Sequence, residues 1–329
     1  MLRNNYHTHT KRCGHAEGED EDYVLEALGS GITDLGFSDH IMLPGFSQPN
    51  VRGEYSVLDD YLESIDNLKQ KYKDRMHIHV GFEAESISEY FPYYRELIES
   101  GTIDYLILGN HFSLGSDHQI KTYFAHTPTS ESIREYRDRA IEALKTGLFS
   151  CFAHPDYYMS AMPKITKEAM KIAKELIQTA MELDIPLEVN VAGIRNGKKD
   201  VGNTLRYIYP TDAFFELAGK MKAKCIIGID AHSPRDISDD DSNSLAVRFA
   251  KKHNLNLIDR LEFKGRKKNE STINCTYSFS SCQFHAHRWY GVFGKKRSKI
   301  MYCLGIEFFG VAFCILVYLY NGRKRTKIF

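Results

Sequence analysis

The chain has 329 residues, of which 43% are hydrophobic and 26% are charged, and this balance is typical of a folded protein with one large domain or two smaller ones. Its formal net charge of zero conceals an uneven distribution, because residues 271–329 hold nine Lys or Arg and a single acid, Glu307, whereas the first 270 residues carry 34 basic and 42 acidic residues. This acidic body argues against a protein that binds the phosphate backbone of nucleic acids. The seven cysteines have no regular spacing and the start of the chain does not resemble a signal peptide, so we expect a reduced, cytoplasmic protein without a disulfide framework.

Seven runs of strand length follow one another along the chain, and stretches with helical spacing separate them. The runs are residues 5–10, 34–40, 77–85, 104–112, 150–156, 186–193 and 224–233. Between them, apolar residues recur every three or four positions, as in 58–72 and 133–144. Strands that alternate with helices indicate a parallel sheet, and about 250 residues is the usual size of a (β/α) barrel. We therefore expect an α/β fold with a closed or distorted barrel, with a doubly wound open sheet as the alternative, and residues 256–265 as a final strand or edge piece.

The first run, "NYHTHT" at residues 5–10, carries two histidines two positions apart. Successive side chains of a strand point to opposite faces, so His7 and His9 share a face and present two ring nitrogens to one point. A metal ion could bind there if other ligands join them. Taken alone, such a pair more often marks a solvated strand face.

Polar and ionisable side chains recur at the carboxyl end of every run. They are His7, His9, Asp39, His40, Glu83, Glu85, His111, His154, Asp156, Glu188, Asn190, Asp230 and His232, with His15 in the loop after the first run. Barrel enzymes carry their chemistry at this end of the strands. A single histidine there is usually a hydrogen-bonded core residue, but so many ionisable groups at one end of a buried sheet would be unfavourable unless a cation compensated them. The repetition predicts a metal centre.

The same residues form a series of motifs in chain order. The motifs are "HTHT" with His15, "FSDH", "GFEAE", "GNHF", "AHPD" and "GIDAHS". This series resembles the polymerase and histidinol phosphatase (PHP) superfamily, and "EVNVAGIRNG" with "YIYPT" resembles its monofunctional histidinol-phosphate phosphatases. The resemblance implies a distorted (β/α)7 barrel as the catalytic domain over residues 1–268, with residues 269–329 as a C-terminal extension.

The resemblance also implies a centre of three divalent ions. His7, His9, Glu83 and Asp230 would hold one ion, Glu83 would bridge to a second held by His111 and His154, and His15, His40 and His232 would hold the third. Mixed imidazole and carboxylate ligands suit Zn, Mn or Fe and do not discriminate among them. Asp39 and Asp156 are candidates to orient a ligating imidazole, and a role as loop caps is the equal alternative.

The implied activity is hydrolysis of L-histidinol phosphate to L-histidinol and phosphate in histidine biosynthesis, by attack of a metal-bridging hydroxide. The substrate is then a small phosphate ester and not a nucleic acid. We expect Arg195 to contact the phosphate, because a guanidinium matches a phosphoryl group, and Asp230 or a metal-bound water to protonate the leaving alcohol. Candidates for recognising histidinol are Glu85, Glu17, Tyr157 and Tyr158, whereas Cys13 has no expected role.

Other functions stay open at this point. A PHP-type phosphoesterase could act on a nucleotide or another small phosphate ester. An amidohydrolase-type barrel also begins with His-x-His, but no strand-end lysine is available to bridge its metals. A metal-binding or membrane-tethered interaction protein could retain the barrel without turnover.

Residues 300–320 form a hydrophobic segment with one charge, Glu307, between basic clusters. About 20 helical residues span a bilayer, although a charge near the middle costs about 2.5 to 3.5 kcal/mol. The segment is therefore interpreted in three ways: a membrane anchor, a helix packed on the barrel or on a partner, or sequence that selection has not shaped. Upstream of it, Cys282, His285 and His287 lack the paired spacing of a metal site.

Overall fold

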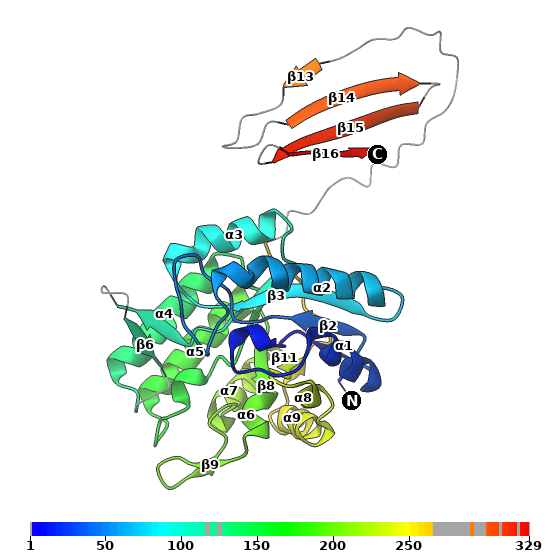
Figure 1. The fold of residues 1–329 in the computed structure, drawn as a ribbon. Coiled ribbons are helices and arrows are strands. Elements are labelled where there is room, and N and C mark those ends of the chain that lie inside the picture. The colour runs from blue at the N-terminus through cyan, green and yellow to red at the C-terminus, as the bar shows by residue number, and fades with distance from the viewer. Residues whose placement is uncertain are drawn as a thin grey trace, which may run out of the picture. The chain divides into compact units, whose positions relative to one another are not determined.

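The structure, a computed structural model, describes residues 2–115, 119–123 and 127–265 and the backbone of four strands between Tyr290 and Ile328. The chain divides into two compact units, residues 1–268 and 269–329. In the first unit, helices surround a curled sheet (Figure 1).

The sheet of the first unit has eight strands in the order β1-β2-β3-β4-β7-β8-β11-β12, and each neighbouring pair is parallel. The strands are β1 (Asn4–Asn5), β2 (Asp34–Phe37), β3 (His77–Ala84), β4 (Tyr105–Leu108), β7 (Cys151–Phe152), β8 (Leu187–Asn190), β11 (Lys224–Gly228) and β12 (Asn256–Leu257). Two small antiparallel hairpins pair β5 (Phe112–Leu114) with β6 (Ile120–Thr122), and β9 (Lys199–Asp200) with β10 (Leu205–Arg206).

Helices connect the strands of this sheet. They are α1 (Asp20–Gly29), α2 (Leu58–Tyr72), α3 (Phe91–Glu99), α4 (Ser130–Lys145), α5 (Lys167–Glu182), α6 (Val191–Arg195), α7 (Asp212–Met221), α8 (Pro234–Ile237) and α9 (Asp240–Lys252). Single 3-10 turns lie at η1 (Lys11–Cys13), η2 (Tyr55–Val57), η3 (Ser88–Tyr90) and η4 (Tyr157–Met159). Each helical connection carries the chain back to the end of the sheet at which the previous strand began, so consecutive strands run parallel.

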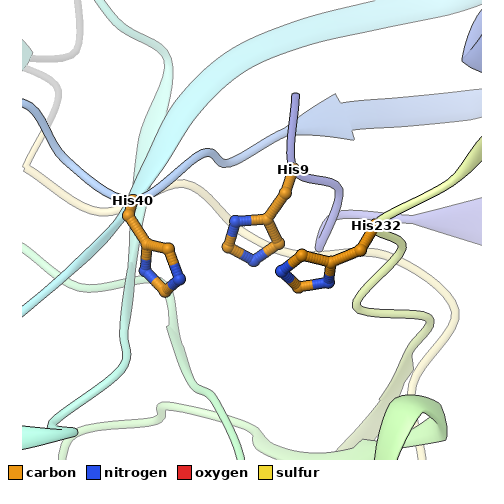
Figure 2. Close-up of side chains that lie close together, drawn as sticks. All are labelled: His9, His40 and His232. Atoms are coloured by element: carbon orange, nitrogen blue, oxygen red, sulfur yellow. The ribbon is translucent and has the colours of Figure 1, made fainter. Parts of the chain in front are cut away.

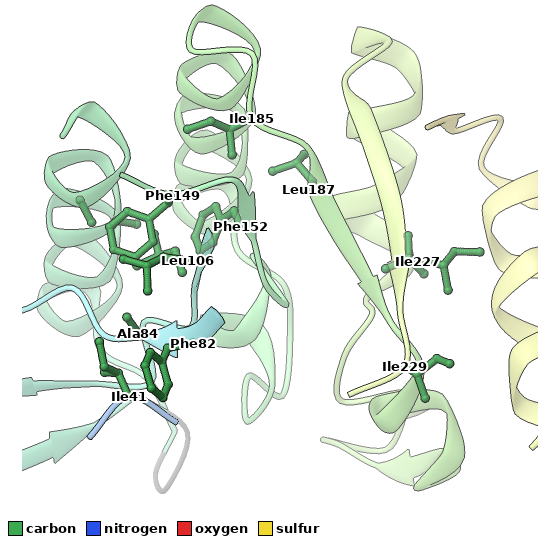
Figure 3. Packing of buried hydrophobic residues seen from close by; sticks show 14 of the residues in the cluster. Ile41, Phe82, Ala84, Leu106, Phe149, Phe152, Ile185, Leu187, Ile227 and Ile229 are labelled. Carbon is green, nitrogen blue, oxygen red and sulfur yellow. The ribbon is translucent and has the colours of Figure 1, made fainter. Parts of the chain in front are cut away.

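The hydrophobic pattern of each helix sets its buried face. In α2, for example, the buried residues recur every three or four positions, which gives one apolar stripe, and they are Leu58, Tyr61, Ile65, Leu68 and Tyr72. The ring of Tyr61 packs against that of Phe82 on β3, with 5.0 Å between centroids. Figure 3 shows the same layer between strands and helices elsewhere in the unit, where Phe149, Phe152 and Leu106 pack together.

An apolar cluster lies inside the barrel beneath the strand ends, and it consists of Tyr6, Tyr105, Ile107, Cys151, Ala153, Ile226 and Leu261. The Tyr105 hydroxyl lies 2.8 Å from the carbonyl oxygen of Tyr6 and 3.1 Å from that of Phe37. A Cβ at Gly36 would lie 2.2 Å from the Tyr105 hydroxyl, and a Cβ at Gly81 would lie 2.6 Å from its ring. Glycine is therefore required at both positions for this side chain to fill the interior.

Backbone hydrogen bonds close the barrel between the segments that follow β1 and β11. The His9 amide donates to the Ala231 carbonyl at 2.9 Å, and the Ala231 amide donates to the His7 carbonyl at 3.2 Å. Thr8 and Ala231 form a parallel bridge. The predicted distorted (β/α)7 barrel is thus confirmed, and the open sheet is wrong. The expected edge piece in residues 256–265 is β12, which pairs with β11.

The predicted run 104–112 is not one strand. Strand β4 ends at Leu108, Asn110 adopts a φ of 51°, and β5 begins at Phe112. Asparagine tolerates the left-handed region better than most residues do. The chain therefore turns immediately before His111.

The second unit contains a four-stranded antiparallel sheet in the order β13-β14-β15-β16. Its strands are β13 (Tyr290–Val292), β14 (Met301–Phe308), β15 (Val311–Tyr320) and β16 (Arg323–Ile328). Within the hydrophobic segment 300–320, Met301–Phe308 and Val311–Tyr320 are two paired strands. The interpretation as a packed helix is therefore wrong, and a helical membrane anchor is not supported. Among the described residues, no helix has the length and apolar character needed to cross a membrane. Cys282, His285 and His287 lie outside the described residues.

Candidate metal centre

A cavity of about 440 Å³ opens at the carboxyl ends of the barrel strands. Eight of the nine predicted metal ligands line it, and they are His9, His15, His40, Glu83, His111, His154, Asp230 and His232. The ninth, His7, is buried beside them. Among the described residues that line the cavity, none is Lys or Arg.

The first predicted group meets where the barrel closes. The Nε2 atoms of His7 and His9 are 3.2 Å apart, which agrees with two side chains on one face of an extended segment. His7 Nε2 lies 3.5 Å from Glu83 Oε2, and His9 Nε2 lies 3.3 Å from Asp230 Oδ1. Four donor atoms from three separate segments thus surround one point.

Glu83, at the end of β3, faces two sets of imidazoles with its two oxygens. Its Oε2 faces His7 and His9, whereas its Oε1 lies 2.8 Å from His154 Nε2 and 3.4 Å from His111 Nε2. The rings of His111 and His154 are 4.8 Å apart between centroids. This arrangement suits a carboxylate that bridges two cations.

The third predicted group lies at the mouth of the cavity. The Nε2 atoms of His15 and His232 are 2.9 Å apart, and the rings of His15 and His40 are 5.5 Å apart. His9 lies between His40 and His232, with ring centroids 4.4 and 4.1 Å away (Figure 2). His40 Nδ1 also lies 3.1 Å from Glu83 Oε2. The first and third groups are therefore continuous, with His9 at their junction.

Several of these positions have an unusual backbone. His154 has a φ of 28° and Asp230 a φ of 50°, in or near the left-handed region that costs a non-glycine residue about 1 to 3 kcal/mol. Each residue stands two positions after the end of a strand, β7 for His154 and β11 for Asp230, and both side chains line the cavity. Such local strain is typical of residues held for function.

The charges of the cluster depend on one another. Burial alone would lower the pKa of His7, but the carboxylates of Glu188 and Asp230 outweigh it and hold that pKa well above its usual value. Burial also opposes protonation of His9, yet Asp230 raises its pKa to about 9. Burial would raise the pKa of Glu83, and the surrounding imidazoles hold it well below its usual value. The buried carboxylates therefore require positive charge beside them, and divalent cations would supply it in place of protons on the imidazoles.

The donor chemistry fits such cations. Asp230 Oδ1 is buried and has no hydrogen-bond donor, although it lies within 3.5 Å of His7 Nε2 and His9 Nε2. Buried carboxylate oxygens without donors are rare unless an ion binds them. Imidazole nitrogens and carboxylate oxygens are ligands for zinc, manganese and iron.

Carboxylates behind the cluster fix the imidazoles. Glu188 Oε1 lies 2.7 Å from His7 Nδ1, and Glu85 Oε1 lies 2.9 Å from His111 Nδ1. Asp39 Oδ1, one of the predicted orienting groups, lies 3.5 Å from His9 Nδ1. The sequence reasoning gave Glu188 no role, although an acid within the buried run 186–193 is itself a signal.

Asp156, the other predicted orienting group, has a different environment. Its Oδ2 accepts a hydrogen bond at 2.5 Å from the amide of Thr211, which precedes α7. Burial raises its pKa to about 6. Asp156 thus joins two loops, as in the alternative interpretation.

The predicted phosphate contact is engaged elsewhere. Arg195 Nε lies 3.3 Å from Asp236 and 3.6 Å from Asp239, and its Nη2 donates to the Ile229 carbonyl at 3.0 Å. The guanidinium is not among the groups that line the cavity. For this side chain to reach a bound phosphate, it would have to exchange these partners.

Two of the four candidates for substrate recognition line the cavity, and two do not. Glu85 and Tyr157 line the cavity, whereas the Tyr158 hydroxyl donates to the Ala169 carbonyl in the core and Glu17 is exposed outside the cavity. Within the described part of the chain, six further residues line the cavity that were not predicted as site residues, and they are Gln48, Asn50, Val51, Phe112, Thr122 and Tyr209.

Comparisons with known proteins agree with this geometry. Residues 5–192 match the family model described as PHP domain. The chain is 25% identical over 251 residues to a probable histidinol-phosphatase of Deinococcus radiodurans, covering 70% of this chain and 86% of that protein. It is 24% identical over 264 residues to a histidinol-phosphatase of Bacillus subtilis, covering 72% and 96%.

A solved structure has the same fold. The histidinol phosphate phosphatase of Lactococcus lactis, complexed with Zn, L-histidinol and phosphate, matches with a TM-score of 0.58 at 18% identity. The match covers 79% of this chain and 99% of that one.

Proposed function

The chain belongs to the PHP domain family, and from this we propose that it is a metal-dependent phosphomonoesterase that hydrolyses L-histidinol phosphate to L-histidinol and phosphate in histidine biosynthesis. The observation that carries the proposal is the cavity at the strand ends, where buried imidazoles and carboxylates face one another. Its relatives in Deinococcus radiodurans and Bacillus subtilis bear the name histidinol-phosphatase. The related Lactococcus lactis structure holds zinc, histidinol and phosphate.

Nine side chains would hold three divalent ions in this proposal. The first ion would be bound by His7, His9, Glu83 and Asp230, the second by Glu83, His111 and His154, and the third by His15, His40 and His232. The separations between their donor atoms, 2.8 to 3.5 Å for the pairs cited above, support groups of this kind.

Divalent ions at such a centre supply an activated water near neutral pH and offset the charge of the phosphoryl oxygens. No lysine or arginine lines the described cavity wall, so the divalent ions would supply the positive charge that offsets the phosphate. Glu83 would set the spacing of two ions through its two oxygens. The proton for the leaving alcohol would come from Asp230 or from a water at the centre.

We also propose that residues 1–268 form the catalytic domain. The matched family region lies within them, and so does every residue that lines the cavity. A cytoplasmic location agrees with Cys13, Cys151 and Cys225, which are unpaired and buried.

The test is a substrate comparison on the purified chain after reconstitution with Zn²⁺, Mn²⁺ or Fe²⁺ and analysis of bound metal. Phosphate release would be measured from histidinol phosphate, an aryl phosphate and a nucleoside monophosphate. We expect kcat/KM for histidinol phosphate to exceed the others by more than tenfold, which corresponds to about 1.4 kcal/mol of discrimination. A smaller preference would contradict the substrate assignment.

A pair of matched variants tests the centre itself. Glu83→Gln should abolish hydrolysis of all three substrates, whereas Glu142→Gln, at an exposed position on α4, should leave it unchanged. Full activity in Glu83→Gln would contradict the metal centre.

A further inference from the structure

Arg52 is a buried cation outside the nine proposed ligands. Its side chain is 0% exposed, and it lies on the loop between β2 and α2. The guanidinium donates to the Ile41 carbonyl at 2.8 Å, to Gln48 Oε1 at 2.9 Å and to Glu85 Oε1 at 3.1 Å. A buried guanidinium is tolerated only when its donors are matched in this way.

Two aromatic rings complete the surroundings of this cation. The guanidinium carbon lies 5.7 Å from the ring centroid of Phe46 and 5.4 Å from that of Phe112. Both distances are within the range of cation–π attraction. The apolar rings also exclude water, which strengthens the ion pair between Arg52 and Glu85.

Glu85 transmits this arrangement to the cluster. While one oxygen pairs with Arg52, the carboxylate also accepts from the His111 amide at 2.7 Å and lies 2.9 Å from His111 Nδ1. A carboxylate beside Nδ1 favours the tautomer that carries its proton there and leaves the Nε2 lone pair free. That Nε2 atom lies 3.4 Å from Glu83 Oε1, on the side of the proposed second ion.

The same cation anchors part of the cavity wall. Gln48, Asn50 and Val51 line the cavity, and they precede Arg52 on the same loop. Besides its side-chain bond to Gln48, the Arg52 amide donates to the Gln48 carbonyl at 3.1 Å. One buried side chain therefore connects a wall of the cavity to the orientation of His111.

We propose that Arg52 is a positioning residue that acts through Glu85 to hold His111 in the orientation and tautomer required to bind the second divalent ion. The role rests on the proposed metal centre. This positioning role requires no contact between Arg52 and the substrate, and it is distinct from a contribution of Arg52 to the stability of the loop.

The test is a metal titration of the metal-free chain, with Zn²⁺ competed against a chromophoric chelator. Arg52→Met should bind one ion about 10- to 100-fold more weakly, the usual effect of removing a group behind a ligand, while the other ions bind as in the wild type. Arg52→Lys keeps the positive charge but not the planar set of donors of a guanidinium. Its affinity for this ion should lie between those of the wild type and Arg52→Met. Wild-type affinity in Arg52→Met would overturn the proposal.

The control removes another ion pair far from the cavity. Lys69 pairs with Asp104 at 2.5 Å beside the start of β4, and Lys69→Met should lower stability without changing the affinity for any ion. An equal loss of affinity in Lys69→Met would overturn the proposal, because the effect would then be general destabilisation.

A double variant covers the case in which Arg52→Met does not fold. Arg52→Met with Glu85→Gln removes both charges and leaves no unpaired carboxylate, and it should lose the same ion as Glu85→Gln alone, since the two residues act in series. Wild-type affinity in the double variant would overturn the role of Arg52. A wild-type chain that binds no Zn²⁺ would refute the proposed function as well, so the two failures are distinguishable.

Discussion

Glu188→Gln is the most informative substitution behind the cluster, because the Glu188 carboxylate contacts two proposed ligands, His7 and His154. Glu188 is buried, and its Oε1 lies 2.7 Å from His7 Nδ1. Its Oε2 accepts from the His154 amide at 3.1 Å and from Asn190 Nδ2 at 2.9 Å. A glutamine has the same size but offers one oxygen and one amide nitrogen in place of two oxygens.

Either orientation of the new amide is unfavourable. If its oxygen faces His7, its nitrogen meets the His154 amide, and an unmatched buried donor costs about 1 to 3 kcal/mol of stability. If its nitrogen faces His7, it donates to Nδ1 and moves the ring proton to Nε2, which then cannot bind a metal. We expect a metal affinity about 10- to 100-fold lower, or a loss of unfolding free energy of about 1 to 3 kcal/mol.

Two measurements on one preparation distinguish these results. Denaturant unfolding of the metal-free chain measures the loss of unfolding free energy expected from an unmatched donor. Zn²⁺ titration against a chelator measures the loss of metal affinity expected from the changed tautomer of His7. The exposed Glu142→Gln makes the same chemical change on α4 and should alter neither quantity. If Glu188→Gln equalled the wild type in both, our account of His7 would be refuted.

Four further outcomes are expected. Exhaustive chelation should abolish phosphatase activity and added Zn²⁺ or Mn²⁺ should restore it; activity that survives chelation would contradict a metal mechanism. Asp39→Asn, beside His9 Nδ1 at 3.5 Å, should weaken metal binding by about tenfold or more, whereas unchanged affinity would make Asp39 a loop cap. Burial, only partly offset by a hydrogen bond to Asp34, lowers the pKa of His79 below 6.5, so the unfolded chain binds more protons at this residue and the free energy of unfolding falls as the pH drops below 6.5. In denaturant unfolding of the metal-free chain, His79→Gln should reduce this dependence on pH. An equal dependence on pH in the variant and the wild type would contradict the assignment. A chain truncated after residue 270 should retain activity in the phosphate-release assay, and a folded but inactive truncation would show that the extension is required.

The barrel could be predicted because its strands are buried and its helices amphipathic. The break after Leu108 was missed, since residues 104–112 read as one apolar run and only the pair Gly109-Asn110 interrupts it. Two of the three interpretations of residues 300–320 were helical, because a long apolar run does not distinguish helix from strand by periodicity. Their many β-branched and aromatic residues favour the strands that form.

The candidate ligands could be predicted because strand order alone brings the strand ends together. The roles of Glu188 and Arg52 could not be predicted, since their partners are distant in sequence: Glu188 contacts His7, and Arg52 contacts Glu85. No local pattern distinguishes a buried arginine with matched acceptors from an exposed one. The environment of Arg195 depends in the same way on helices α8 and α9, which supply Asp236 and Asp239.

The seam that closes the barrel also explains why the proposed centre lies where it does. Thr8 and Ala231 pair across the seam, and in an extended chain the residues on either side of a paired position turn their side chains the other way. His7 and His9 flank Thr8 on an extended segment, and Asp230 and His232 flank Ala231, where Asp230 turns with a φ of 50°. The pairing of Thr8 with Ala231 therefore brings these four donors close together. An ion held by His7, His9 and Asp230 would link the segments that follow β1 and β11, and its binding free energy would add to the stability of closure. Loss of a ligand at this seam therefore weakens the closure of the barrel together with the chemistry.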